Sequence, residues 1–337
     1  MQSTIFVDCI RHFLLIENVM KNLIISVVIF CGLQSTIFAD DNFIPEIPKF
    51  KGCCAKRIAP TDTNENVRPK ISAQNTKHKK QSTKYKIVAL SPAITEIIYA
   101  LGAGDKIIAV SDFCEFPPEV KSKAKVGGVF NPSFEKMLSL RPNLLIYQGE
   151  FPRIKEFCKT YKIPVCNVQL DDIKTITNSI QQIGEKIGKS EKAKKLRRKI
   201  CNSLRKIKSD KNIPVFVCVG REPGVVASCT TIGKKSFINE MLKIAGGSNV
   251  CEDVIGLYPT VSSEIILSRK PEIIFELCPA RKVNKERIKE EWKLISKGAR
   301  VIILTNDYLM VPGPRITKLF SQFKKYILEE EKKREGN

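Results

Sequence analysis

The chain has 337 residues, enough for about two domains of ~100–200 residues each, and its formal net charge is +22. A charge of this sign admits a nucleic acid, an anionic membrane surface or an acidic ligand as a partner. The lysines, however, are scattered over predicted helix faces and no RNA- or DNA-binding motif accompanies them, so we expect a solvated lysine-rich surface and no nucleic-acid partner. The only two histidines, His12 and His78, lie outside the predicted folded core, which argues against a catalytic triad or a histidine-ligated metal site.

Residues 1–39 have the organisation of an export signal peptide. Lys21 supplies a positive charge, the apolar stretch 23–33 follows, and Ala39 closes a plausible cleavage site. These apolar residues are too few to cross a bilayer, which takes about 20. Met20 is an alternative start, and Cys31 is an alternative lipid-attachment site, although the residue before it is bulky. A soluble periplasmic product is the preferred interpretation.

Residues 40–84 are polar and lysine-rich, which predicts a disordered leader. An N-terminal lobe is predicted over residues 85–170, where short apolar runs alternate with amphipathic helices. This alternation is typical of a parallel sheet with helices on its faces. The predicted strands are 87–90, 107–110, 144–147 and 165–168, and the predicted helices are 95–101, 132–140 and 152–161.

Residues 171–211 carry a helical pattern with no strand signal and are predicted to form one long connecting helix. Isoleucines recur at steps of three and four, and after Gly188 the apolar spacing resumes. A coiled coil is the alternative, but the repeat is short and Gly184 and Gly188 interrupt it. The apolar positions are Ile173, Ile176, Ile180, Ile183, Ile187, Leu196, Ile200, Leu204 and Ile207.

The second half of the chain repeats the first. The segment that runs from Glu135 to Pro142 and into an apolar strand recurs 129 residues later, from Glu264 to Pro271. Further strands are predicted at 215–219 and 301–304. We therefore expect an α/β fold of two similar Rossmann-like lobes, the second over 212–330, joined by one long backbone helix with a ligand cleft between them.

Three segments resemble the helical-backbone class of periplasmic binding proteins, which serve ABC importers for cobalamin, haem and ferric siderophores. They are KIVALSPAITEIIYALGAGDKIIAVSDFCEFPPEV, KVGGVFNPSFEKMLSLRPNLLIY and SFINEMLKIAGGSNV. The resemblance covers roughly residues 85–325 and is closest to the cobalamin-binding branch. It implies a monomeric periplasmic protein without catalysis or cofactor that binds a corrinoid and delivers it to a permease with its ATPase.

The resemblance also places the ligand in the cleft, against loops at the carboxyl ends of the strands, where open α/β sheets generally bind ligands. A corrin is a broad apolar disc rimmed with amides, so aromatic walls and a few polar groups suit it. Each aromatic residue could instead cap the core of its own lobe, and Asp307 could instead cap a helix. The ligand-binding candidates are Pro92, Phe116, Phe130, Gln148, Arg221, Tyr258, Asp307 and Tyr308.

Glu135 and Glu264 occupy matching first turns of the two repeated helices. In the family that this sequence resembles, a surface glutamate on each lobe docks onto arginines of the transporter, and arginine–carboxylate bonds suit such an oriented encounter. The alternative is a favourable interaction with the helix N-terminus, worth about 0.3–1 kcal/mol.

Several alternatives stay open at this level. A ferric-siderophore or haem binder of an iron importer would use Arg221 and Arg315 for anions, or Tyr258 and Tyr308 as haem ligands. Cobalamin binders can carry a tryptophan where Gln148 stands and an arginine where Val311 stands, which weakens the corrinoid assignment.

A dinucleotide-binding enzyme is disfavoured because LGAGDKII at 101–108 lacks the third glycine of that motif. Trp292, the single tryptophan, is predicted to lie in the core.

The cysteines are predicted to serve two purposes. Export permits disulfides, for which Cys53, Cys54 and Cys114 are the better candidates. Cys166 and Cys218 lie in apolar runs, where a small buried thiol is expected.

Overall fold

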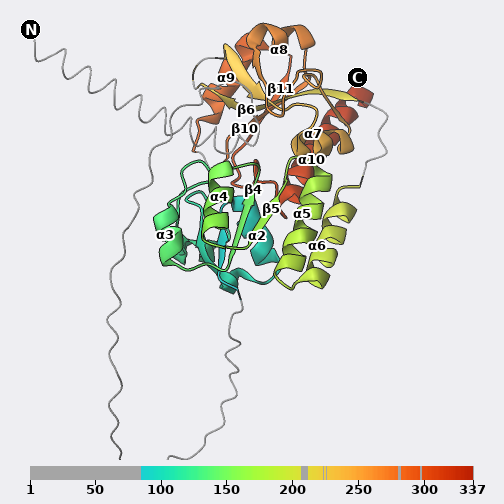
Figure 1. The fold of residues 1–337 in the computed structure, drawn as a ribbon. Coiled ribbons are helices and arrows are strands. Elements are labelled where there is room, and N and C mark those ends of the chain that lie inside the picture. Colours follow the sequence, from blue (N-terminus) through green and yellow to red (C-terminus); the bar gives the residue numbers. More distant parts are fainter. Residues whose placement is uncertain are drawn as a thin grey trace, which may run out of the picture. The chain divides into compact units, whose positions relative to one another are not determined.

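The computed structural model describes residues 85–336 except for 206–211, 223, 225, 280, 281 and 297. The predicted signal peptide and polar leader lie outside the described residues. Within the described part, two sheets with helices on both faces form two lobes (Figure 1). The predicted two-lobed α/β fold is confirmed.

The N-terminal lobe is a parallel sheet of order β3-β2-β1-β4-β5. The chain winds outward from β1 in both directions, so the order reverses between β1 and β4, which is the usual ligand site of such sheets. The strands are β1 (Ile87–Ala89), β2 (Ile107–Val110), β3 (Ala124–Lys125), β4 (Leu144–Gln148) and β5 (Val165–Val168). The helices are α2 (Pro92–Ala100), α3 (Phe134–Ser139) and α4 (Pro152–Thr160), with 3₁₀ turns at Gly104–Lys106 and Pro118–Ser122.

The C-terminal lobe has a mixed sheet of order β11-β10-β6-β7-β9. Strands β11, β10 and β6 are parallel, whereas β7 runs antiparallel to β6 and β9, and β8 pairs with the first half of β6. The strands are β6 (Ile213–Arg221), β7 (Ser228–Thr231), β8 (Gly247–Asn249), β9 (Thr260–Ser262), β10 (Ile273–Leu277) and β11 (Arg300–Leu304). The helices are α7 (Phe237–Ile244), α8 (Ser263–Arg269), α9 (Lys285–Ile295) and α10 (Ile316–Gly336).

The connection between the lobes differs from the prediction. Instead of one helix over 171–211, two helices, α5 (Ile173–Lys186) and α6 (Ser190–Ser203), pack side by side (Figure 1). Gly188 takes a left-handed φ of +70° that ends α5 and turns the chain. Gly184 lets the two helices approach closely, because a Cβ there would lie 2.4 Å from the Cβ of Ala193.

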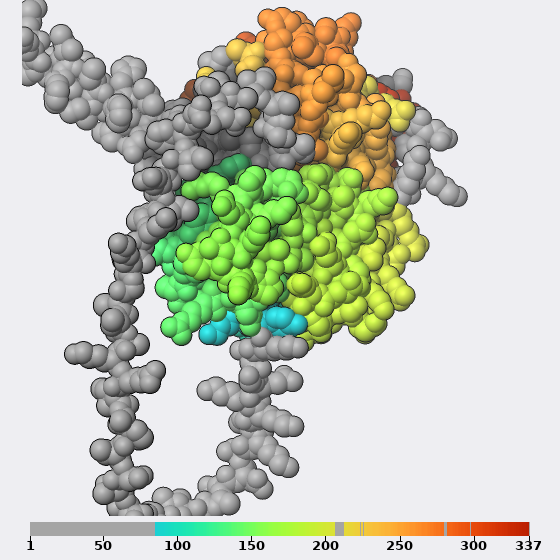
Figure 2. Space-filling view, in the orientation of Figure 1, coloured from blue at the N-terminus to red at the C-terminus, as the bar shows by residue number. Residues whose placement is uncertain are grey.

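Both helices form part of the molecular surface, where their yellow-green residues are visible in the space-filling view (Figure 2). The start of α5 is fixed by a capping box, in which the Asp172 carboxylate accepts from the Thr175 backbone N–H at 2.6 Å while the Thr175 hydroxyl accepts from the Asp172 N–H at 3.0 Å. Among the described residues, no helix has the length and apolar content needed to cross a bilayer.

Apolar burial joins the two lobes. One cluster of buried side chains contains Ile87 of β1, Ile176 of α5, Ile213 of β6 and Phe323 of α10. Separate clusters cover the other face of each sheet; Trp292 is fully buried in that of the C-terminal lobe, as predicted. Seven of the described cysteines are free thiols: Cys114, Cys158, Cys166, Cys201, Cys218, Cys229 and Cys251. Cys114, predicted as a disulfide candidate, is a buried thiol between the hydroxyls of Ser111 and Thr95, at 3.1 and 3.2 Å.

Candidate ligand-binding site

Polar groups join the ends of β1 and β4, where the strand order of the N-terminal lobe reverses. Pro92 is the first residue of α2, directly after β1, a position that suits proline because the first helical N–H needs no partner. Next to it, the Ser91 hydroxyl donates to the side-chain oxygen of Gln148 at 2.8 Å. The structure therefore brings the neighbourhoods of two predicted ligand residues, Pro92 and Gln148, together at the expected edge.

Two of the predicted aromatic residues are exposed. Phe116 is 37% exposed and Phe130 is 42% exposed. Phe130 contacts the ring of Phe151 edge to face, with centroids 5.2 Å apart, and Phe151 directly precedes α4. Neither Phe116 nor Phe130 is a core residue of its lobe, and part of each ring is exposed.

The two tyrosines have a different environment. Tyr308 is 8% exposed and its hydroxyl accepts from Gln322 at 2.6 Å. Tyr258 packs against the core, and burial raises the pKa of its hydroxyl. Both tyrosines therefore help to close the core of the C-terminal lobe, which was the alternative role considered for them.

Arg221, predicted as a ligand residue, has almost no exposed side chain to offer a ligand. Its side chain is 4% exposed, and its Nε lies 3.0 Å from Glu276, with Nη1 2.8 Å from Glu291. The guanidinium lies over the Trp292 ring, whose N–H donates to Glu276 at 2.7 Å. Burial alone would lower the pKa of Arg221, but the two carboxylates reverse the effect and raise it. Arg221 is thus a structural cation of the C-terminal lobe.

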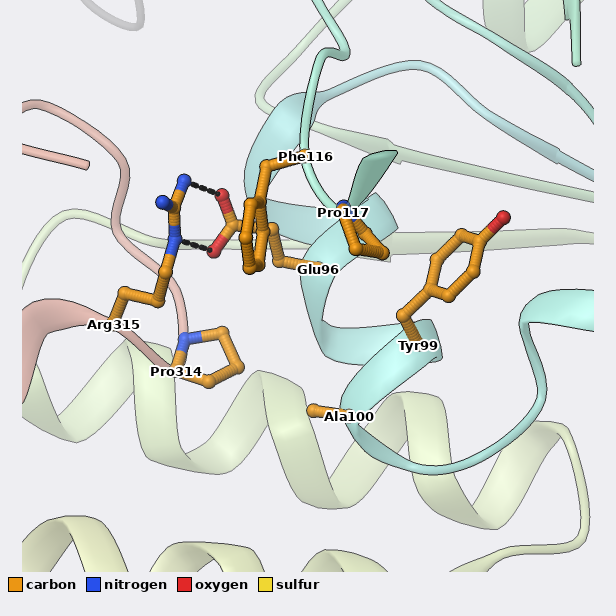
Figure 3. A pocket seen from close by; sticks show the side chains of 7 residues that line it. All are labelled: Glu96, Tyr99, Ala100, Phe116, Pro117, Pro314 and Arg315. Atoms are coloured by element: carbon orange, nitrogen blue, oxygen red, sulfur yellow. Dashed lines mark hydrogen bonds and ion pairs between the residues drawn. The ribbon is translucent and has the colours of Figure 1, made fainter. Parts of the chain in front are cut away.

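Another arginine, Arg315, links the C-terminal lobe to the N-terminal lobe. Arg315, just before α10, donates from Nε and Nη2 to the two oxygens of Glu96 on α2, at 2.9 and 2.6 Å (Figure 3). Its Nη1 donates to Asp307 at 2.7 Å, and the Phe116 ring covers its planar face at 3.8 Å from the centroid. Arg315 therefore contacts two predicted ligand residues, Phe116 and Asp307, which belong to different lobes. Asp307 does not cap a helix, the alternative considered for it.

Electrostatics favour the charged form of only one partner of this pair. Burial raises the pKa of Glu96, although the hydrogen bonds and charge of Arg315 oppose the shift. For Arg315, burial alone would lower the pKa, but Glu96 and Asp307 together raise it. The pair is thus a desolvated, bidentate bond whose geometry fixes α2 against the segment before α10.

A hollow opens beside this pair. It has a volume of about 270 Å³ and is lined by Glu96, Tyr99, Ala100, Phe116, Pro117, Pro314 and Arg315 (Figure 3). Typical pockets for small molecules have roughly 300–1,000 Å³. A whole macrocycle therefore does not fit inside it.

The two repeated glutamates have matching surroundings. Glu135 and Glu264 lie exposed in the first turns of α3 and α8. A left-handed residue follows each helix, Arg141 at φ 48° two residues after α3 and Lys270 at φ 46° directly after α8, and a proline and a buried strand come next. A hydrogen bond with Ser262 lowers the pKa of Glu264. The sequence repeat is thus a structural repeat that presents one carboxylate on each lobe.

Sequence reasoning missed Glu96 entirely and considered Arg315 only as a grip for anions. These residues are 219 positions apart, and neither has a motif that links it to the other. Within the described part of the chain, no group of three or more histidine, cysteine or acidic side chains could hold a metal ion.

The sequence matches the periplasmic binding protein family over residues 87–296. It is 28% identical to the vitamin B12-binding protein of Vibrio parahaemolyticus over 239 residues, which are 68% of this chain and 84% of that protein. It is 31% identical to the ABC transporter substrate-binding lipoprotein YvrC of Bacillus subtilis over 245 residues, covering 68% of this chain and 76% of that protein.

Solved structures of periplasmic binding proteins match this chain as well. A possible iron-binding (periplasmic solute-binding) protein of Staphylococcus epidermidis is 28% identical and aligns with a TM-score of 0.59, covering 72% of this chain and 99% of that chain. The periplasmic vitamin B12-binding protein BtuF of Vibrio cholerae, at 24% identity, shares the fold with a TM-score of 0.61, over 73% of this chain and 97% of that chain. The chain therefore belongs to the periplasmic binding protein family, whose members similar to it are substrate-binding proteins and not enzymes.

Proposed function

We propose that this protein captures a corrinoid outside the cytoplasm and delivers it to the permease of an ABC importer. The observation that carries the proposal is the pair of exposed phenylalanines, Phe116 and Phe130, in loops of the N-terminal lobe. Apolar rings exposed in this way suit the face of a broad, mostly apolar macrocycle. The 28% identity to a vitamin B12-binding protein supports the same ligand.

The proposed contacts combine these rings with a small number of polar groups. Pro92 and Gln148 lie where the sheet order reverses, and Asp307 offers an exposed carboxylate that can accept from the amide N–H groups of a corrin rim. Tyr258 and Tyr308 would support this surface from the core side. Arg221 is left out because its guanidinium is buried.

A titration tests the ligand. Cyanocobalamin, haem and a ferric siderophore are added separately to the purified protein, and binding is followed by calorimetry. We expect saturable binding of cyanocobalamin at micromolar concentration or below. Phe116→Ala and Phe130→Ala should each weaken it by about tenfold, since a buried aromatic contact contributes on the order of 1–2 kcal/mol. Tyr161→Ala, which removes an exposed ring at the end of α4, is the matched control and should have no effect.

An iron chelate is the second candidate ligand, because a solved relative at 28% identity is described as a possible iron-binding protein. The same titration decides between them. Tight binding of haem or a ferric siderophore without binding of cyanocobalamin would replace the corrinoid with an iron compound.

Glu135 and Glu264 are the proposed docking residues for the permease. Each is an exposed carboxylate on a different lobe, at the same position of the repeat. Charge reversal with Glu135→Lys and Glu264→Lys should abolish ligand uptake by cells while the ligand dissociation constant stays the same. Glu156→Lys on the exposed face of α4 is the control. Normal uptake by a folded double variant would rule out this role.

A further inference from the structure

The outer side of α6 concentrates positive charge. Residues 174–205 contain ten lysine and arginine residues and two glutamates, whereas residues 85–173 contain eleven lysine and arginine residues and ten aspartates and glutamates. The lysines are therefore less evenly scattered than the sequence alone suggested. Ala193 and Ile200 occupy the buried side of α6. The exposed cations of this segment, which we call the basic face, are Lys192, Lys194, Lys195, Arg198, Lys199 and Arg205.

The protein itself does little to neutralise the basic face. Between described residues, its one ion pair joins Lys194 to Glu191 at 2.8 Å. Lysines on α9 differ, because they alternate with glutamates and form ion pairs with them at 3.0 and 2.7 Å. Lys195 and Lys199 stand one helical turn apart on α6, and like charges at this spacing destabilise a helix. An anionic partner would relieve this repulsion.

The basic face is open to a broad partner. Helix α6 packs on α5, and both helices form part of the molecular surface (Figure 2). The exposed large apolar side chains of the described residues all lie outside α5 and α6. The face therefore offers no large apolar or aromatic side chain to insert into lipid hydrocarbon or to stack on nucleobases. It suits a partner that presents negative charge over a surface.

Building on the proposed delivery to a permease, which lies in a lipid bilayer, we propose that the basic face holds the protein reversibly on the anionic phospholipid surface of that membrane. Each lysine or arginine near such a surface strengthens binding by about fivefold. Attachment by charge without apolar insertion is reversible and weakens with salt. Glu135 lies on α3, on the other side of the N-terminal lobe from α6 (Figure 1), so this contact leaves the proposed docking residue uncovered.

Vesicle sedimentation tests this membrane contact. The purified protein, without added chelate, is mixed with vesicles of phosphatidylcholine alone or of phosphatidylcholine and phosphatidylglycerol in equal parts, and the bound fraction is measured after centrifugation. We expect binding to the vesicles that contain phosphatidylglycerol and none to the others at about 0.1 M salt, where charges are screened over about 10 Å. Binding should be lost at about 1 M salt, where the screening length is about 3 Å.

A variant of the basic face assigns the contact to α6. Lys195→Gln, Arg198→Gln and Lys199→Gln together remove three charges and keep good helix formers at these exposed positions. The membrane partition constant should fall on the order of a hundredfold, from about fivefold per residue, while the thermal unfolding midpoint stays the same. The matched control removes the same charge from α9 and should bind like the natural protein. Its substitutions are Lys285→Gln, Lys289→Gln and Lys293→Gln.

The outcomes separate this inference from the proposed function. The calorimetric dissociation constant for cyanocobalamin should be equal in the natural protein and the α6 variant. Absence of chelate binding would overturn the proposed ligand, whereas salt-sensitive binding to phosphatidylglycerol that depends on α6 would still support the membrane contact. No binding to these vesicles, equal binding by the α6 variant, or binding that salt does not weaken would each overturn it. Retention on a soluble phosphodiester polymer without binding to vesicles would assign the basic face to a polyanion and would overturn the membrane contact as well.

Discussion

A buried cation surrounded by carboxylates makes Arg221 a stability residue, and this can be measured. Replacing it by methionine keeps the length of the side chain but leaves Glu276 and Glu291 without their shared cation. Breaking a buried ion pair from one side costs about 3–5 kcal/mol. We expect Arg221→Met to lower the free energy of unfolding by that amount in urea, followed by the fluorescence of Trp292, the single tryptophan.

An exposed pair provides the control for this prediction. Lys194 and Glu191 form an ion pair on the outer face of α6, with both side chains at least half exposed. Lys194→Met should therefore leave the unfolding curve unchanged. Equal unfolding midpoints for Arg221→Met and the natural protein would contradict the structural role of Arg221.

The described cysteines are expected to differ in how fast their thiols are alkylated. Cys201 is exposed on α6, whereas burial raises the pKa of both Cys158 and Cys251 to about 11. Only about one in a thousand of those thiols is ionised at pH 8, and the thiolate is the reactive form. Brief alkylation with iodoacetamide followed by peptide mass spectrometry should modify Cys201 and spare Cys158 and Cys251. All three should react in urea, and rapid modification of Cys251 in the folded protein would refute the prediction.

Individual residues were predictable where a local pattern placed them at a strand end. Phe116 and Phe130 could be named in advance because they follow recognisable apolar runs, and the structure leaves both rings exposed. The bond between Glu96 and Arg315 could not be predicted from the sequence, because it depends on how two distant segments of the chain meet. The surroundings of Arg221 were unpredictable for a related reason: it is the last residue of β6, but the carboxylates that surround it come from β10 and α9.

At the scale of elements, the sequence repeat predicted the helix–proline–strand unit of both lobes, and the matched left-handed residues Arg141 and Lys270 show why it holds. The connecting segment was harder. Its isoleucine spacing is the same whether the chain forms one long helix or two packed ones, so periodicity alone could not place the turn. The distinction lies in Gly188, whose left-handed φ ends α5, and glycine within a helical pattern is tolerated as well as disruptive.

The packing of α5 on α6 gives a prediction at this scale. Gly184→Ala would place a Cβ 2.4 Å from that of Ala193, so the helices must separate, at a cost of about 1–3 kcal/mol in the free energy of unfolding. Adding Ala193→Gly should restore much of that loss, since it removes the opposing methyl group. Urea unfolding of both single variants and the double variant measures the coupling.

Gly188→Ala is the matched comparison. A Cβ at this position meets no atom within 4 Å, but the backbone is left-handed, so the substitution strains the chain without crowding a neighbour. Ala193→Gly should therefore not rescue Gly188→Ala. If the effects of Gly184→Ala and Ala193→Gly on the free energy of unfolding were simply additive, the packing of the two helices would not depend on this contact.

At the scale of the whole described chain, three features tie the lobes together. A single apolar cluster includes strands of both sheets, and Arg315 bonds to Glu96. At the start of α5, the Phe237 N–H donates to the Asp171 carbonyl at 2.7 Å, and the Ile173 N–H donates to Glu240 at 2.8 Å. Large hinge motion would have to break buried bonds and open apolar surface, both of which are costly.

Small-angle X-ray scattering tests this restraint. In the natural protein, the radius of gyration should stay within experimental error when a chelate saturates the site. Glu96→Ala leaves Arg315 without its bidentate partner, so the two lobes should separate more easily and the ligand-free protein should scatter as a larger particle. Glu156→Ala on the exposed face of α4 should behave like the natural protein. A marked contraction of the natural protein on ligand addition would show instead that the lobes close around the ligand and that the bond between Glu96 and Arg315 does not restrain them.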